Sequence, residues 1–308
     1  MALFFSRRAY HAKTQKFTNN PASVTRYVAI SQTNPDGTIH KGAAIPQADW
    51  LERVKQAGGD SEVLIYVHGF NTSQTDMLRR LKKIEDGVRA QGFTGAVIAY
   101  DWPSDGTVLA YNTDRTDAKK TAPYLVCDGI VPLLNMTPRP KVHLIAHSMG
   151  ALVVLRGFAG VGDSASAGAR NWKVDEVTFC AADVNADWLE RGAWGALVLD
   201  RRAARFTNYY SCRDEVLAFA GGFINGGRER AGHMGISEPI TKGQWDIYCN
   251  EQYKRDVPDN EKTQVYSHRW WFDNDGFYKD LALTIDGADA QTMVTRRPTN
   301  EADLALLT

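Results

Sequence analysis

The 308-residue chain lacks an excess of charge, a cysteine pattern and a long apolar run. Lysine plus arginine equals aspartate plus glutamate at 36 each, so no overall field attracts nucleic acid or an anionic membrane. The four cysteines show no CxxC spacing, which excludes a recognisable disulfide framework or zinc signature. No apolar run approaches membrane-spanning length, and the short apolar start does not resemble a secretory signal. We therefore expect a cytoplasmic protein without metal, nucleic-acid partner or membrane insertion, and composition leaves its oligomeric state open.

What the chain does contain is an alternation of short apolar runs and helical patterns. Runs typical of strands lie at 24–31, 63–67, 95–100, 142–146, 176–182 and 205–211. Helical patterns lie at 74–91, within 112–134, at 149–160 and at 277–285. This order predicts an α/β fold with a mostly parallel twisted sheet, helices on both faces and antiparallel strands at the N-terminal side. The length suits a single domain over 1–308, in which 291–308 is expected to be a loose tail.

The segment KVHLIAHSMGA (141–151) carries the most information about function. A predicted buried strand ends before Ser148 and a predicted buried helix begins after it. Ala146 and Gly150, two residues to either side, are small enough for the strained turn of a nucleophile elbow. We therefore predict that Ser148 is a nucleophile. The alternative is that Ser148 only caps the helix, since serine is a preferred N-cap residue.

A second informative segment, HGFNTS (68–73), follows the predicted strand 63–67. In hydrolases with a nucleophile elbow, this loop and the residue after the nucleophile each supply one backbone N–H to the oxyanion hole. The predicted donors are therefore the N–H groups of Phe70 and Met149. The alternative is that Gly69 only makes a turn at the end of the strand.

A serine nucleophile needs a base, which in this arrangement follows it in the chain. Of the seven histidines only His233 and His268 lie downstream beyond the elbow itself. His268 precedes the predicted last helix, where such a base is expected, and we predict it to be the base. His233, in a glycine-rich stretch, is the alternative, and His268 could instead be a buried structural histidine.

The base needs an acid to orient it, and two aspartates follow predicted strands after the elbow. Asp183 follows the strand at 176–182, and Asp214 follows the strand at 205–211. The acid usually follows the later of these strands, so Asp214 is the first choice and Asp183 the competitor. Either aspartate could instead be a helix N-cap on the surface.

The segment 218–253 lies between the predicted acid and base and is rich in glycine. We expect it to form a lid or pocket insertion. Phe219 and Phe223 within it, with Trp102 near the expected mouth, are candidate substrate-pocket residues. The alternative is that these aromatic side chains only pack the loops in place.

The sequence resembles the family known as alpha/beta hydrolase of unknown function (domain of unknown function 900), whose members look like esterases and lipases. The resemblance rests on the motifs HGFNTS (68–73), DWPS (101–104), YNTDR (111–115), VHLIAHSMG (142–150), AADVNAD (181–187) and SCRDEVL (211–217). It implies an α/β-hydrolase fold with Ser148 as nucleophile, Asp214 as acid and His268 as base. Asp101 stands where the family commonly has serine, and Ala182 where it often has proline; these departures leave the predicted triad untouched and bear on pocket polarity.

Together these features predict a serine carboxylic-ester hydrolase that forms an acyl-enzyme on Ser148 and requires no cofactor. Its partner would be a small-molecule ester. An acyltransferase, or an amidase or peptidase, would use the same triad on another acceptor or bond. A non-catalytic interaction protein could also keep this scaffold, because fold does not imply function. The Ser-Asp-His order and the HG loop argue against that last interpretation.

Overall fold

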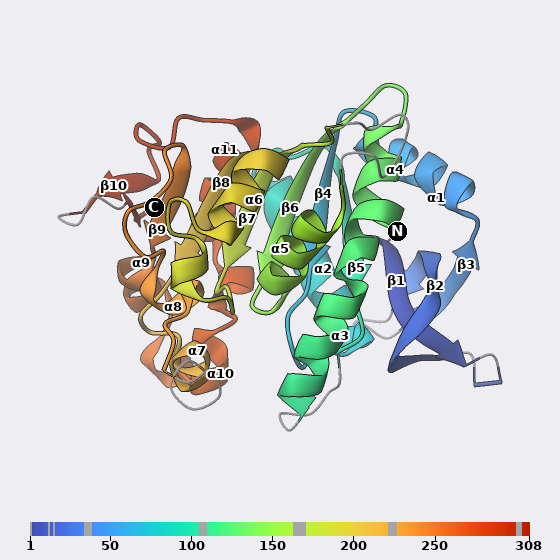
Figure 1. The fold of residues 1–308 in the computed structure, drawn as a ribbon, viewed down its shortest axis with the longest axis horizontal. Coiled ribbons are helices and arrows are strands. Elements are labelled where there is room, and N and C mark those ends of the chain that lie inside the picture. The colour runs from blue at the N-terminus through green and yellow to red at the C-terminus, as the bar shows by residue number, and fades with distance from the viewer. Residues whose placement is uncertain are drawn as a thin grey trace. The chain divides into compact units, whose positions relative to one another are not determined.

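The computed structural model describes residues 2–11, 13–14, 16–33, 39–104, 110–162, 171–220, 227–299 and 304–308. The chain divides into two compact units, which are treated separately below. Figure 1 labels their helices and strands. Unit 1 comprises Met1–Lys82 and Thr94–Val174, and unit 2 comprises Lys83–Phe93 and Asp175–Thr308. Over the ranges just given, no helix combines the length and apolarity needed to cross a membrane.

The sheet of unit 1 has the strand order β6-β4-β5-β1-β2-β3. Its strands are β1 (Ala2–His11), β2 (Lys16–Thr33), β3 (Ile39–Ile45), β4 (Glu62–Val67), β5 (Ala96–Asp101) and β6 (Lys141–His147). β1, β5, β4 and β6 are parallel, whereas β1, β2 and β3 pair antiparallel. The mostly parallel sheet and the antiparallel strands predicted at the N-terminal side are both confirmed.

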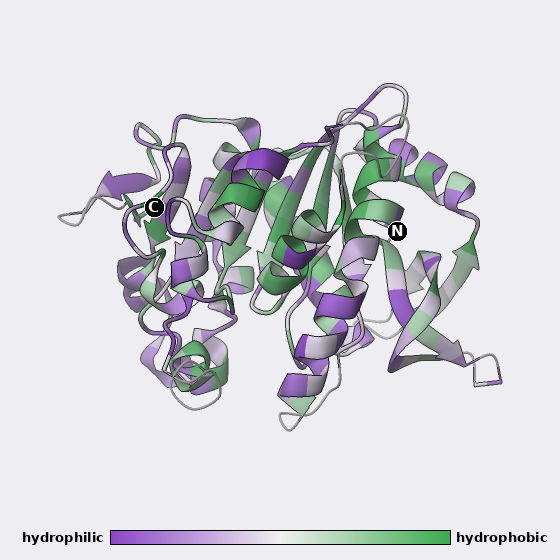
Figure 2. Cartoon of the chain, viewed as in Figure 1, coloured by the Kyte–Doolittle hydropathy of each residue, from purple (hydrophilic) through white to green (hydrophobic). Residues whose placement is uncertain are grey.

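Helices cover this sheet because its central strands are apolar on both faces. Residues 63–67 of β4 are all fully buried, as expected for a parallel strand between two helical layers. Helix α5 packs against β4, β6 and α3, and Figure 2 shows the hydrophobic residues concentrated in the strands and in α5. The helices that lie wholly or partly in unit 1 are α1 (Gln47–Val54), η1 (Lys55–Gly59), α2 (Gln74–Ala90), α3 (Tyr111–Tyr124), η3 (Leu125–Ile130), α4 (Val131–Leu134) and α5 (Gly150–Gly160).

The strands of unit 2 lie in the order β10-β11-β9-β8-β7. They are β7 (Val174–Cys180), β8 (Ala203–Tyr210), β9 (Gln244–Tyr248), β10 (Arg296–Pro298) and β11 (Leu304–Leu306). β8, β9 and β11 run parallel, and β10 pairs antiparallel with β11. The helices are η4 (Ala186–Trp188), α6 (Trp194–Arg202), α7 (Glu215–Phe219), α8 (Ala231–Met234), α9 (Asn250–Asp256), η6 (Asp259–Glu261), α10 (Gln264–Ser267), η7 (Trp270–Asp273) and α11 (Asp275–Asp286).

Two segments differ from what the sequence pattern predicts. The tail 291–308, expected to be loose, forms β10 and β11, and Leu304 and Leu306 are buried. Three-residue strands are too short to produce a periodic pattern, and β11 gains its order by pairing with β9. The segment 218–253 contains α8 and β9, so part of the expected insertion is regular structure. Its role as a lid, and the single domain over 1–308, remain predictions.

Candidate active site

Ser148 lies in the sharp turn between β6 and α5. Its φ is 55°, in the left-handed region that costs a residue other than glycine about 1–3 kcal/mol. A Cβ atom at Gly150 would lie 2.3 Å from the carbonyl oxygen of Val67, so the following helix approaches β4 only because position 150 is glycine. Strand, strained serine and small flanking residues together have the geometry of a nucleophile elbow.

The loop that follows β4 passes directly beside this turn. A Cβ atom at Gly69 would lie 2.7 Å from the Cβ of Ser148 and 3.2 Å from its Oγ. Glycine therefore lets the loop backbone approach the serine hydroxyl more closely than any other residue would. Phe70, the next residue, packs edge-on against Tyr111 with ring centroids 5.3 Å apart. The predicted donors Phe70 and Met149 thus belong to two segments that flank Ser148.

In unit 2 the structure brings together Asp214 and His268. Asp214 follows β8 and caps α7, where its Oδ1 accepts a hydrogen bond of 3.0 Å from the N–H of Leu217. Its Oδ2 lies 2.6 Å from Nδ1 of His268, at the C-terminal end of α10. Both side chains are buried. Because the carboxylate accepts at Nδ1, this nitrogen carries the proton and Nε2 of the neutral ring does not.

This geometry is accompanied by a family match. Residues 44–247, more than half of the chain, match the model of the family described as "Alpha/beta hydrolase of unknown function (DUF900)". The chain belongs to this family. The α/β-hydrolase fold class predicted from the sequence is therefore confirmed.

Individual proteins are also similar to this chain, over short segments or at low identity. An uncharacterised Nostoc protein, alr1448, is 42% identical over 59 residues, which cover 19% of this chain and 15% of the Nostoc protein. A cutinase-like protein from Cryptococcus sp. aligns with 75% of this chain and 97% of its own at 14% identity, with a TM-score of 0.39. A predicted CIB-like hydrolase from Thermoplasma acidophilum aligns over 73% and 84% at 14% identity, with a TM-score of 0.34. Likenesses this weak carry no information about activity, and the family assignment rests on the sequence match.

Asp183, the competing acid, has a different partner within the same unit of this α/β hydrolase. Its Oδ1 lies 3.2 Å from Nε of Arg230, and both side chains are buried. Arg230 also donates a short hydrogen bond to Oδ1 of Asn185. Asp183 therefore neutralises a buried guanidinium, whereas Asp214 is the aspartate that contacts a histidine downstream of Ser148.

The other predicted site residues lie in varied positions. Trp102 is completely buried, and its indole ring supports the loop after β4. Phe219, at the C-terminal end of α7, is half exposed, and Phe223 lies outside the described residues. His233, the alternative base, lies on α8. Over the described part of the chain, no group of three or more His, Cys, Asp or Glu side chains is placed to hold a metal ion.

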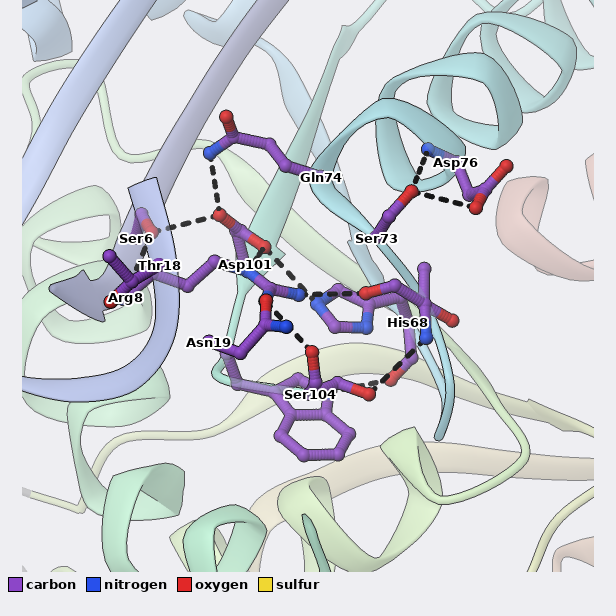
Figure 3. Close-up of polar contacts among 12 residues, drawn as sticks. Ser6, Arg8, Thr18, Asn19, His68, Ser73, Gln74, Asp76, Asp101 and Ser104 are labelled. Atoms are coloured by element: carbon purple, nitrogen blue, oxygen red, sulfur yellow. Dashed lines mark hydrogen bonds and ion pairs between the residues drawn. The ribbon is translucent and has the colours of Figure 1, made fainter. Parts of the chain in front are cut away.

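Sequence reasoning missed a buried polar cluster next to the loop at 68–72. Asp101, at the end of β5, forms an ion pair with Arg8 of β1, and His68 lies 3.4 Å from the same carboxylate oxygen (Figure 3). Burial tends to raise the pKa of Asp101, but the charge of Arg8 and the contact with the His68 ring lower it well below its usual range. Burial lowers the pKa of His68, which opposes its protonation. The signal in the sequence was the polar run Ser6-Arg7-Arg8, which directly follows the apolar residues Leu3, Phe4 and Phe5.

Proposed function

We propose that the chain is a serine hydrolase that cleaves carboxylic esters through an acyl-enzyme on Ser148. The observation that carries the proposal is the buried 2.6 Å contact between Asp214 and Nδ1 of His268. It occurs in a chain whose elbow serine, Ser148, precedes both residues in the order that this family of folds uses. A histidine held in this tautomer by a buried carboxylate is suited to act as a general base.

In the proposed reaction, Nε2 of His268 takes the hydroxyl proton while Oγ of Ser148 attacks the ester carbonyl carbon. The backbone N–H groups of Phe70 and Met149 receive the oxyanion, and Asp214 stabilises the imidazolium. The bond to the alcohol oxygen then breaks, and His268 gives its proton to the leaving alcohol. Water attacks the acyl-enzyme, loses a proton to His268, and releases the carboxylic acid with Ser148 restored. The reaction requires no cofactor.

The test is hydrolysis of p-nitrophenyl esters from acetate to palmitate by the wild type and four variants. Ser148→Ala and His268→Ala should lower kcat by roughly 10⁴-fold or more, because each removes an essential member of the triad. Asp214→Asn should lower kcat by about 10⁴-fold, because the amide favours the wrong histidine tautomer. Asp183→Asn is the matched control, since it alters a buried aspartate that contacts arginine instead of histidine.

Rates should be expressed per folded protein, because Ser148→Ala has no serine to label and variants without the base label slowly. Reaction of Ser148 with a fluorophosphonate is measured separately. Near-wild-type turnover in Ser148→Ala would contradict the proposal, and a larger loss in Asp183→Asn than in Asp214→Asn would transfer the acid role to Asp183. If Ser148 is labelled but esters are not hydrolysed, the bond is an amide or the acceptor is not water, and varied acceptors identify it. A folded protein whose Ser148 does not react would favour a binding role.

A further inference from the structure

The ion pair between Arg8 and Asp101 is almost completely buried. Both side chains are at most 1% exposed, and Nε of Arg8 lies 2.7 Å from Oδ1 of Asp101. The second carboxylate oxygen, Oδ2, accepts hydrogen bonds from Ser6 and Gln74 (Figure 3). Burying two charges has a large desolvation cost, which close contact and further hydrogen bonds must offset. A buried ion pair often adds little net stability to a fold, which suggests another role for Arg8 and Asp101.

The remaining nitrogens of Arg8 bind the backbone of two segments, namely the end of the loop that carries the predicted oxyanion donor and the segment that follows β5. Nη2 donates 2.8 Å to the carbonyl oxygen of Thr72, and Nη1 donates 2.9 Å to the carbonyl oxygen of Ser104. Nη1 also donates to Oδ1 of Asn19 at 2.7 Å. Asp101 thus orients a planar guanidinium whose other edge holds the end of the loop at 68–72. A lysine would keep the charge but not this fork of donors.

The beginning of the loop is held as well. The indole of Trp102 stacks on the ring of His68 at 5.2 Å and 8°, and its Nε1 donates 2.7 Å to the carbonyl oxygen of His68. At the other end, the N–H of Thr72 donates 3.2 Å to Oγ of Ser104, which in turn donates to Asp114. Only residues 69–71 lie between the two fastened ends, so the backbone of Phe70 has little freedom.

The fastened loop lies against the candidate nucleophile. Since a Cβ atom at Gly69 would be 2.7 Å from the Cβ of Ser148, the loop backbone runs this close to the serine only because position 69 is glycine. A small movement of the loop away from the serine would displace the Phe70 N–H from it. Oxyanion donors act only when they are already in place as charge develops, and a displacement of about 1 Å can cost about 100-fold in rate.

We propose that Arg8 and Asp101 are positioning residues that hold the loop at 68–72 so that the Phe70 N–H is directed at the reacting oxygen. The catalytic part of this inference rests on the function proposed above. Holding the loop is independent of that function and has its own measurement.

The test compares Arg8→Lys with Arg296→Lys, a matched change in a buried arginine–aspartate pair of unit 2. Native-state hydrogen exchange should show the amides at 69–72 exchanging about tenfold faster, or more, in Arg8→Lys than in the wild type, with no such change in Arg296→Lys. With ester substrate, kcat per labelled Ser148 should fall about 10- to 100-fold in Arg8→Lys while KM changes less than about twofold, because a transition-state contact is lost.

Asp101→Asn provides a second variant should Arg8→Lys not fold. It keeps the shape of the side chain and removes the charge that orients the Arg8 guanidinium, so it should also accelerate exchange at 69–72. Unchanged exchange and unchanged kcat in the folded variants would overturn the proposal, as would equal effects in Arg296→Lys. If the wild type cleaves no ester, the function proposed above fails, and the exchange data still decide whether Arg8 holds the loop.

Discussion

Two buried carboxylates, Asp101 in unit 1 and Glu176 in unit 2, both bind an arginine but differ in ionisation. Asp101 accepts hydrogen bonds from Arg8, Ser6 and Gln74. Burial alone would raise its pKa, yet the charge of Arg8 and the contacts with Arg8 and His68 lower the pKa below its usual range. Asp101 therefore remains charged throughout the range in which proteins normally function.

Glu176 has fewer and weaker partners. It accepts hydrogen bonds from Nε of Arg205 and Oγ1 of Thr207, and Arg205 is 36% exposed and also donates to the carbonyl oxygen of Thr284. Burial raises the pKa of Glu176 to about 7, and the hydrogen bonds only limit the rise. The comparison teaches that the number of donors and the burial of the cation decide whether a buried carboxylate stays ionised. The fully supported carboxylate is the one beside the candidate active site.

A third buried carboxylate, Asp280, separates two explanations for the difference between Asp101 and Glu176. The difference could follow from the number of hydrogen-bond donors or from the unit in which the carboxylate lies. Asp280 lies in unit 2 like Glu176, but accepts hydrogen bonds from four residues, which is one more than Asp101 has: Arg296, Tyr209, Thr295 and Thr284. Asp280→Asn should lower the free energy of unfolding by about 3–5 kcal/mol, because the buried Arg296 loses its counter-charge. Urea unfolding at neutral pH measures the loss, with Asp280→Leu/Arg296→Met as the control that removes both charges. A loss of less than about 1 kcal/mol in the free energy of unfolding of Asp280→Asn would contradict the view that hydrogen-bond donors keep a buried carboxylate ionised.

Glu176→Gln should change how stability depends on pH. The unfolded carboxyl has an ordinary pKa near 4.5, so between about pH 4.5 and 7 the folded protein keeps a proton that the unfolded chain has lost. Stability from this group therefore falls as the pH rises through that window, by about 3 kcal/mol. Glutamine cannot ionise, so the variant should lack this fall in urea unfolding experiments across the window. Parallel profiles for variant and wild type would show that Glu176 is already ionised, as Asp101 is.

The smallest effect is expected for an exposed pair. Lys83 and Asp273 form a close ion pair with side chains 43% and 36% exposed. Lys83→Met should change the free energy of unfolding by at most about 1 kcal/mol, because water and salt screen both charges. Thermal unfolding at low and high salt measures the change, which should shrink as salt is added. A loss as large as that in Asp280→Asn would mean that burial does not govern these pairs.

Local patterns in the sequence were sufficient to predict much of the fold and the turn at Ser148. Apolar runs predicted β4, β5, β6, β7 and β8 with small errors at their ends. The small residues around Ser148 predicted a strained turn because only such residues allow strand and helix to approach. These features depend on neighbours in the chain, which a sequence displays directly.

Contacts between distant residues were not predictable in the same way. Arg8 and Asp101 are 93 positions apart, and nothing in either local pattern indicates that they meet. The strand β11 could not be predicted from the local sequence either, since its three residues are ordered by pairing with β9. Whether a charged side chain is buried, and which residue of opposite charge pairs with it, can be inferred only when the three-dimensional fold is known.

The sequence by itself determined the family, the alternation of strands and helices, and the residue types available for the chemistry, because periodicity and motif spacing are local properties. Only the tertiary structure distinguished the two aspartates, placing Asp214 on His268 and Asp183 on Arg230. It also placed Arg8 of the first strand on the loop beside Ser148. Partners of buried polar groups are chosen by packing, because each such group must find a counterpart wherever the fold brings one within reach.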